Sequence, residues 1–249
     1  MSAAPGIVLC SGWSSGPAAW TGVLDALPAL PVAHLDWWTA LADPADALKA
    51  AAARANAAAG RAPDAPVIAV GWSLGGQIAL RAAIDAPEAV SDLVLIATPV
   101  RLLADETGLG TDPAALRAMR QGLRRDAAGI VKAFWGEALA GDRTGYDHDE
   151  VFATLADVDA KTLDAGLAAL EKTDLRRRLP QVAAPTVVLQ GDDDRIVGVH
   201  AAQQLNDGVP TCAVLAVAGG SHALPLTHPR MVAEVIAALA NAQSGEADR

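Results

Sequence analysis

The sequence predicts an α/β fold in which a mostly parallel central sheet carries helices on both faces. Short runs rich in valine, isoleucine and leucine alternate with longer alanine-rich segments, which is typical of a strand, helix, strand succession. The short runs are apolar almost throughout, as in strands that are buried on both faces of a sheet. One long stretch breaks this alternation and indicates an inserted subdomain.

Six runs are expected to form the strands of the sheet. They cover residues 6–10, 32–38, 67–71, 93–97, 186–191 and 212–217. Helices are expected at 43–60, which begins with Asp-Pro and ends at a glycine, at 77–86, and at 228–242, which has a proline in its first turn.

Residues 98–185 read as helices without strands. The simplest explanation is an insertion that leaves the sheet and returns to it. We therefore predict a core formed by residues 1–99 and 180–249, and a helical lid formed by residues 100–179 that caps the edge of the sheet.

Composition disfavours several classes of protein. The 249 residues suffice for one large domain or for a domain with an inserted subdomain. No apolar run reaches the roughly 18 residues of a membrane span, and the N-terminus lacks the pattern of a secretory signal, so we expect a cytoplasmic protein without a membrane partner. A net charge of −10 disfavours nucleic acid, because the only dense basic runs are residues 120–125 and 176–178.

The strongest functional signal is a short motif. Gly71-Trp72-Ser73-Leu74-Gly75 has the spacing G-x-S-x-G, directly after an expected strand and directly before a helical pattern. The glycines permit a sharp turn that lifts the serine into a strained conformation above the sheet. Because a serine hydroxyl is a weak nucleophile by itself, Ser73 needs an acid and a histidine base, which should follow it in that order.

The base is expected among five histidines. His34 and His148 fit the chain order poorly, and His200 lies in an expected helix. His222 lies in a glycine-rich loop just after the last strand, where small neighbours leave room for a mobile imidazole. That position favours His222 over His228, which adjoins a proline at the start of a helix.

The acid is expected in the loop after residues 186–191. That strand is followed by Asp192, Asp193 and Asp194, and their positions alone do not decide which of the three carboxylates is the acid. The remaining two are expected to lie in solvent or to cap the turn. Three consecutive carboxylates lack the alternation of a calcium loop, so no metal is predicted there. Cys10 and Cys212 are expected to be buried, reduced thiols rather than metal ligands.

Two backbone N–H groups are needed to stabilise the negative charge that develops on an ester carbonyl oxygen. One is expected from Leu74, the residue after the serine. The other is expected from Trp13, in the loop after the first strand, where flexible Gly12 precedes it.

Taken together, these residues resemble the α/β-hydrolase family, and within it the carboxylesterases of biotin synthesis. The resemblance runs from SGW near the N-terminus through GWSLGGQIAL and APEAVSDLVLIAT, and it is most specific in LEKTDLRRRLPQVAAPTVVLQGDDDRIV and GGSHALPLTHP. It implies an α/β-hydrolase fold with an inserted helical lid. It also implies a nucleophile, a base, an acid and two oxyanion donors, which fall on Ser73, His222, Asp194, Trp13 and Leu74.

The chain departs from the family pattern at three points. Ser11 stands where the family usually has histidine, and residues 36–44 replace a glycine-rich turn. The family's lid carries arginines that contact acyl-carrier protein, whereas the matching stretch here, residues 126–150, retains only Lys132 and Arg143. The resemblance implies a pimeloyl methyl ester on acyl-carrier protein as substrate, but acidic residues 147–150 would repel that acidic partner.

We therefore expect a serine carboxylic-ester hydrolase that forms an acyl-enzyme intermediate on a small-molecule ester and needs no metal and no organic cofactor. A general short-chain carboxylesterase, a thioesterase or acyltransferase with the same residues, and a non-catalytic binding protein on the same fold are the alternatives. Six residues are expected either to line an apolar acyl pocket or to pack in the core: Trp13, Trp72, Phe134, Trp135, Leu167 and Leu170.

Overall fold

The computed structural model describes residues 3–245, which contain one six-stranded, fully parallel sheet in the order β2-β1-β3-β4-β5-β6. The strands are β1 (Ile7–Cys10), β2 (Val32–Leu35), β3 (Val67–Trp72), β4 (Val90–Ile96), β5 (Thr186–Gly191) and β6 (Cys212–Val217). The strand order changes direction between β1 and β3. In open parallel sheets, ligands bind beyond the carboxyl ends of the strands at such a switch point.

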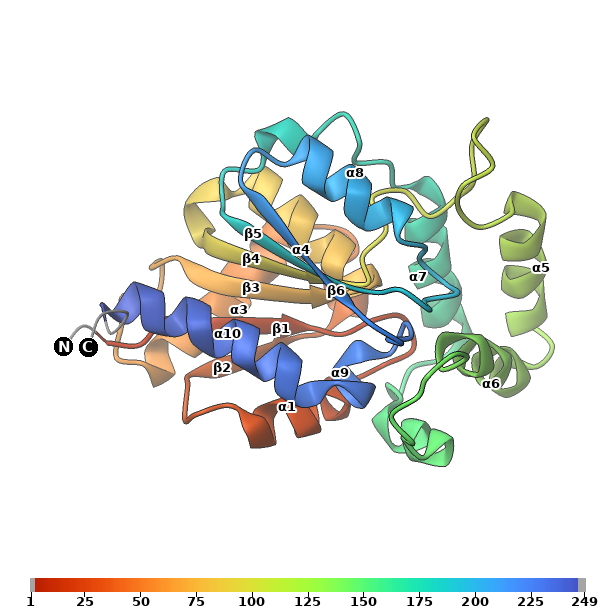
Figure 1. The fold of residues 1–249 in the computed structure, drawn as a ribbon, viewed down its shortest axis with the longest axis horizontal. Helices are drawn as coiled ribbons and strands as arrows, with labels where there is room; N and C mark the ends of the chain where they lie inside the picture. The colour runs from red at the N-terminus through yellow and green to blue at the C-terminus, as the bar shows by residue number, and fades with distance from the viewer. Residues whose placement is uncertain (1–2, 246–249) are drawn as a thin grey trace.

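Helices cover both faces of the sheet and confirm the expected α/β fold. On one face α3 (Pro44–Ala58) packs against α4 (Leu74–Asp85), behind the strands in Figure 1. On the other face α1 (Thr21–Ala26) packs against α10 (Pro229–Ser244), which crosses in front of the sheet. Next to β5 and β6 lies α8 (His200–Gly208). Short helical turns complete the core: α2 (Trp37–Ala40), α9 (Leu224–Thr227), η1 (Pro17–Trp20), η2 (Pro87–Ala89) and η4 (Leu179–Gln181).

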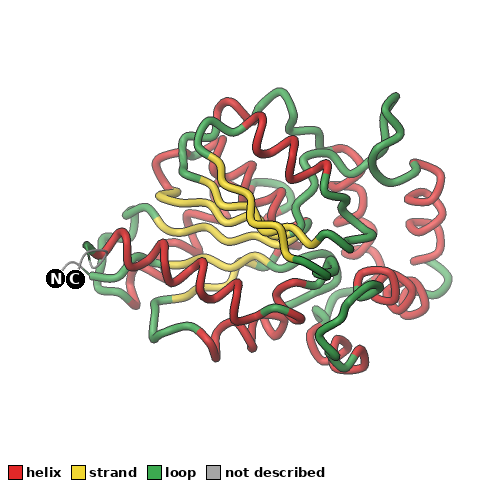
Figure 2. Tube along the Cα trace, viewed as in Figure 1, coloured by secondary structure: helices red, strands yellow, loops and turns green. Residues whose placement is uncertain are grey.

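The chain leaves the sheet after β4 and returns at β5. In between it forms α5 (Pro113–Leu123), α6 (Ala127–Ala138), η3 (His148–Thr154) and α7 (Ala160–Lys172), which lie beyond the carboxyl ends of the strands (Figure 1). Loops fill the space between these helices and the sheet (Figure 2). An aspartate side chain caps the first turn of α5, α6 and α7, which explains where each helix begins.

Element boundaries differ from the sequence prediction in the first half of the chain. The second strand ends at Leu35 rather than at residue 38, because Trp37 turns inward at the start of α2 and its indole N–H donates to the carbonyl of Ser15. The fourth strand begins earlier than expected, at Val90, and the helix after β3 begins at Leu74 rather than at residue 77.

The last strand is not buried on both faces as expected. Since β6 has a neighbour on one side only, its residues are partly exposed, and the side chain of Leu215 is 43% exposed. Cys212 on this strand is half-buried, whereas Cys10 is fully buried, and both thiols are free. No helix among the described residues is long and apolar enough to cross a membrane.

Candidate active site

Ser73 stands at the sharp turn between β3 and α4. Its backbone has a φ of 55° and a ψ of −116°, a conformation that is strained for any residue with a side chain. A Cβ atom on Gly71 would overlap the carbonyl oxygen of Gly75, and a Cβ atom on Gly75 would overlap that of Cys10. Glycine is therefore required at both positions, because the start of α4 lies directly against the ends of β1 and β3.

The side chains of Ser73, His222 and Asp194 form a hydrogen-bonded series. The Oγ atom of Ser73 lies 3.0 Å from Nε2 of His222, and Nδ1 of His222 lies 2.9 Å from Oδ2 of Asp194. These residues are only 5%, 1% and 8% exposed, so water competes little for their hydrogen bonds. The fold thus brings together three candidates that follow three different strands, β3, β6 and β5.

Asp194 is held by hydrogen bonds on both of its oxygens. Its Oδ1 accepts from the backbone N–H groups of Ile196 and Val197 at 2.8 and 2.9 Å. Its Oδ2 faces His222 and also accepts from the side-chain amide of Gln190 at 3.2 Å. The contact from Gln190 was not predicted from the sequence, because its only signal was a single glutamine at the end of an apolar strand.

Replacing Gln190 with leucine should lower kcat for a p-nitrophenyl ester about tenfold, the usual cost of one lost hydrogen bond at a buried polar group, with little change in KM. Asp194 would keep its backbone contacts but lose a donor on the oxygen that faces His222. Steady-state kinetics and a melting curve measured together would check this. An unchanged kcat, or a loss that follows thermal stability alone, would contradict the positioning role.

The two acidic neighbours of Asp194 have partners of their own. Asp192 accepts from the backbone N–H of Gly219 at 2.6 Å, and Asp193 forms an ion pair with Arg143 at 2.7 Å. Asp192 therefore ties the acid loop to the loop that carries His222, and Asp193 ties it to the segment after α6. The expectation that both lie in solvent or cap their own turn was incomplete.

His222 is fixed by contacts from several sides. Its backbone N–H donates to the carbonyl of Ala138 at 3.1 Å, and its own carbonyl accepts from the indole of Trp72 at 2.9 Å. The imidazole lies between the rings of Trp72 and Phe134, with centroids 6.1 and 6.2 Å away. The histidine is thus anchored to the core through Trp72 and to the lid through α6.

The other four histidines lie in different surroundings. His228 makes a local contact, with Nδ1 2.9 Å from Oγ1 of Thr227, at the residue before α10. His200 begins α8, as its expected helical position implied. His34 lies in β2, and His148 begins η3 in the lid.

Two backbone N–H groups are available beside Ser73. Leu74 begins α4, where N–H groups have no partner within the helix. Gly12 packs against the serine, since a Cβ atom on it would lie 3.4 Å from the Cβ of Ser73. The next N–H along the chain is that of Trp13, and no residue within the described range accepts from it.

Indole N–H groups hold the loop of residues 11–16 that carries Trp13. Trp20 donates to the hydroxyl of Ser11 at 2.9 Å, and that hydroxyl donates to the carbonyl of Gly16. Ser11, which replaces the usual histidine, thus closes the loop on itself. Three further indoles bind nearby: Trp37 to the carbonyl of Ser15, Trp135 to the hydroxyl of Ser14, and Trp13 to the carbonyl of Leu163 in α7.

A cavity of about 180 Å³ lies over Ser73, beneath the lid. Four of the six residues expected for an acyl pocket line it, namely Trp13, Phe134, Leu167 and Leu170. Trp72 and Trp135 do not line it. They pack against each other in the core with ring centroids 5.8 Å apart, because each indole N–H is already bonded inward.

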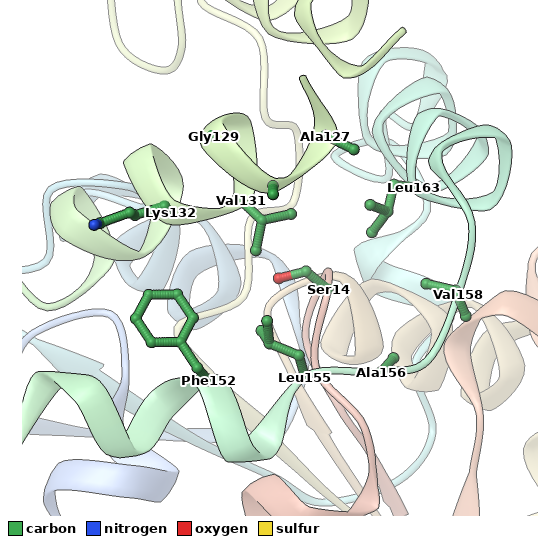
Figure 3. Close-up of a pocket in the computed structure, with 11 residues that line it drawn as sticks. Ser14, Ala127, Gly129, Val131, Lys132, Phe152, Leu155, Ala156, Val158 and Leu163 are labelled. Carbon is green, nitrogen blue, oxygen red and sulfur yellow. The ribbon is translucent and has the colours of Figure 1, made fainter. Parts of the chain in front are cut away.

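A second cavity, of about 430 Å³, shares no lining residue with the first. Figure 3 shows the hydroxyl of Ser14 pointing into it, with Phe152 and Lys132 on one side and Leu163 on the other. Its walls come from α6, η3 and the start of α7, and Ser73 does not line it.

Cys10 is not suited to replace Ser73 as a nucleophile, although it ends β1 near the same turn. Burial raises the pKa of its thiol, which therefore stays protonated and unreactive. Among residues 3–245, no cluster of three or more histidine, cysteine or acidic side chains is arranged to hold a metal ion.

Comparisons with known proteins identify the family of this chain. A family model described as the alpha/beta hydrolase family matches residues 7–235. The pimeloyl-[acyl-carrier protein] methyl ester esterase of Nitrosomonas europaea is 30% identical over 244 residues, which cover 94% of this chain and 95% of that protein. The protein of the same name from Xanthomonas oryzae pv. oryzae is 34% identical over 182 residues, which cover 69% of each chain.

Solved structures share the fold over most of their length. A bromoperoxidase from Bacillus anthracis superposes with a TM-score of 0.77 at 22% identity, covering 94% of this chain and 91% of that one. An esterase from Exiguobacterium antarcticum gives a TM-score of 0.76 at 15% identity, covering 96% and 93%. At these identities the likeness bears on the fold alone.

Proposed function

Because this chain belongs to the alpha/beta hydrolase family, we propose that it is a serine carboxylic-ester hydrolase that acts through an acyl-enzyme intermediate. The observation that carries the proposal is the buried series of Ser73, His222 and Asp194, whose contacts of 3.0 and 2.9 Å suit proton transfer from the serine. The esterase names of the relatives support the same class of reaction.

In the proposed reaction, Oγ of Ser73 attacks the ester carbonyl carbon while Nε2 of His222 takes its proton. Asp194 accepts from Nδ1–H, which keeps the ring in the required tautomer and stabilises its charged form. The N–H groups of Trp13 and Leu74 donate to the carbonyl oxygen as it becomes negative. His222 then protonates the leaving alcohol, and a water molecule activated by the same histidine releases the acid from Ser73.

Hydrolysis of p-nitrophenyl butyrate, combined with labelling by a fluorophosphonate probe, tests the proposal. We expect turnover and a single label on Ser73, located by mass spectrometry of the digested protein. A non-catalytic binding protein on this fold would give neither. Faster release from butyryl-coenzyme A than from the butyrate ester would instead favour the thioesterase alternative.

A narrower function follows from the relatives' printed names. We propose as a second candidate that the ester is carried on acyl-carrier protein, as the name of both relatives states for them. Arg117, Arg124 and Arg125 are exposed on or just after α5, the helix whose Leu116 and Met119 line the cavity over Ser73. A basic surface beside the cavity suits an acidic carrier, while exposed acidic residues 147–150 oppose it.

Growth without biotin would separate the two candidates. We expect the chain to restore growth to a host that lacks its own pimeloyl ester esterase, and Arg124→Glu to weaken that rescue while p-nitrophenyl butyrate turnover stays within about twofold. Arg230→Glu makes the same charge change at an exposed position on α10, outside the lid, and should rescue normally. No rescue by the unchanged chain, with good activity on small esters, would favour a general carboxylesterase.

A further inference from the structure

Arg195 is the only charged residue that lines the cavity over Ser73, within the range that the structure describes. It follows Asp194 directly in the acid loop, and it is exposed at the rim of the cavity. It makes no hydrogen bond or ion pair with any residue of the described chain. Its guanidinium group therefore has only solvent as a partner.

The three carboxylates that precede Arg195 are each engaged elsewhere. Asp192 accepts from the backbone of Gly219, and Asp193 is paired with Arg143. Asp194 has both oxygens in hydrogen bonds to other groups. Although Arg195 adjoins three negative charges in sequence, none of them forms an ion pair with it.

The rest of the cavity wall explains what this arginine could recognise. The cavity wall is apolar where it is formed by Phe134, Leu167 and Leu170. Two opposite charges beside such a surface attract each other more strongly than in bulk water. A guanidinium group matches a planar carboxylate through two parallel hydrogen bonds. The cavity volume of about 180 Å³ lies below the roughly 300–1,000 Å³ of pockets for drug-sized ligands, so the acyl chain that fits is short.

We propose that Arg195 is a specificity-determining residue that pairs with a free carboxylate at the far end of the acyl chain. The substrate class is then the monoesters of short dicarboxylic acids, with the ester carbonyl at Ser73, the methylene chain along the apolar wall and the carboxylate at Arg195. This inference rests on the proposed ester hydrolase function. It differs from the carrier-linked candidate, in which the far end of the chain bears no free charge.

Monomethyl adipate and methyl hexanoate provide the test, because the two esters have the same chain length and differ in the terminal carboxylate. We expect the unchanged protein to prefer monomethyl adipate in kcat/KM, measured as methanol release. Arg195→Gln should lower kcat/KM for monomethyl adipate roughly tenfold and leave methyl hexanoate within about twofold. Arg195→Lys should lie between, since it keeps the charge but loses the planar fork, and high salt should reduce the preference.

Arg230→Gln serves as the control, because it removes the same charge from an exposed arginine on α10 and should leave the ratio of the two substrates unchanged. An unchanged ratio in Arg195→Gln, or an equal loss on both esters, would overturn the assignment. A loss of activity in Arg195→Gln that appeared only with an ester linked to a carrier protein would also overturn the assignment. If the unchanged protein hydrolyses p-nitrophenyl butyrate but neither methyl ester, the assignment of Arg195 fails while the proposed function stands. If it hydrolyses none of the three esters, the proposed function itself fails, which is a distinct result.

Discussion

Ser73→Ala is expected to lower kcat for p-nitrophenyl butyrate by about 10⁴-fold or more, as in other serine hydrolases that lose their nucleophile. No other described side chain offers a hydroxyl to Nε2 of His222, so no acyl-enzyme can form. The fold should persist, since the hydroxyl of Ser73 has His222 as its only hydrogen-bond partner in residues 3–245. The backbone strain at this position is unchanged by the substitution.

Turnover, fluorophosphonate labelling and a melting curve of the same preparation check this result. Ser91→Ala is a suitable control, because it removes a hydroxyl that contacts Gln243 far from the turn and should keep full activity. Substantial turnover or labelling in Ser73→Ala, with Ser91→Ala behaving normally, would remove the serine from the proposed mechanism.

Asp194→Asn is expected to lower kcat by about 10⁴-fold, the loss seen where the acid of such a series becomes an amide. An asparagine side chain is neutral, and its NH₂ group favours the tautomer in which Nε2 of His222 carries the hydrogen and cannot accept a proton from Ser73. Initial rates with p-nitrophenyl butyrate across neutral pH measure the effect.

The neighbouring acids give matched controls for that experiment. Asp192→Asn removes a charge from an exposed contact with Gly219 and should leave kcat within a few fold. Asp193→Asn weakens the exposed pair with Arg143 and should do the same. If either control lost as much activity as Asp194→Asn, the acid would have to be reassigned.

Much of the fold could be predicted because its signals are local. The apolar strand before Ser73, the two glycines around it and the helical pattern after it all lie within one short stretch, and the turn follows from them. The histidine and the loop of three acids were predicted by position, because each follows a strand whose carboxyl end must reach the same edge of a parallel sheet. Position left Asp192, Asp193 and Asp194 open, and only the family resemblance selected Asp194.

Features that depend on distant side chains could not be predicted in the same way. The second strand ends at Leu35 because the indole of Trp37 turns inward and donates a hydrogen bond to the carbonyl of Ser15. That contact exists only in the folded chain. An aromatic residue near the serine can equally line a cavity, as Phe134 does, or pack inward, as Trp135 does. The roles of Gln190 and Arg195 likewise depend on which partners the fold leaves beside them.

The indole bonds around residues 11–16 have a consequence for how the protein folds. Trp13 and Trp135 join this loop to α7 and α6, which are separated from it by more than a hundred residues of chain. Contacts between residues so far apart in the sequence form late in folding, because other contacts must first offset the entropic cost of closing the long loop between them. The loop of residues 11–16 is therefore fixed only when α6 and α7 have packed against it, so the arrangement around Ser73 is complete only once those helices are in place.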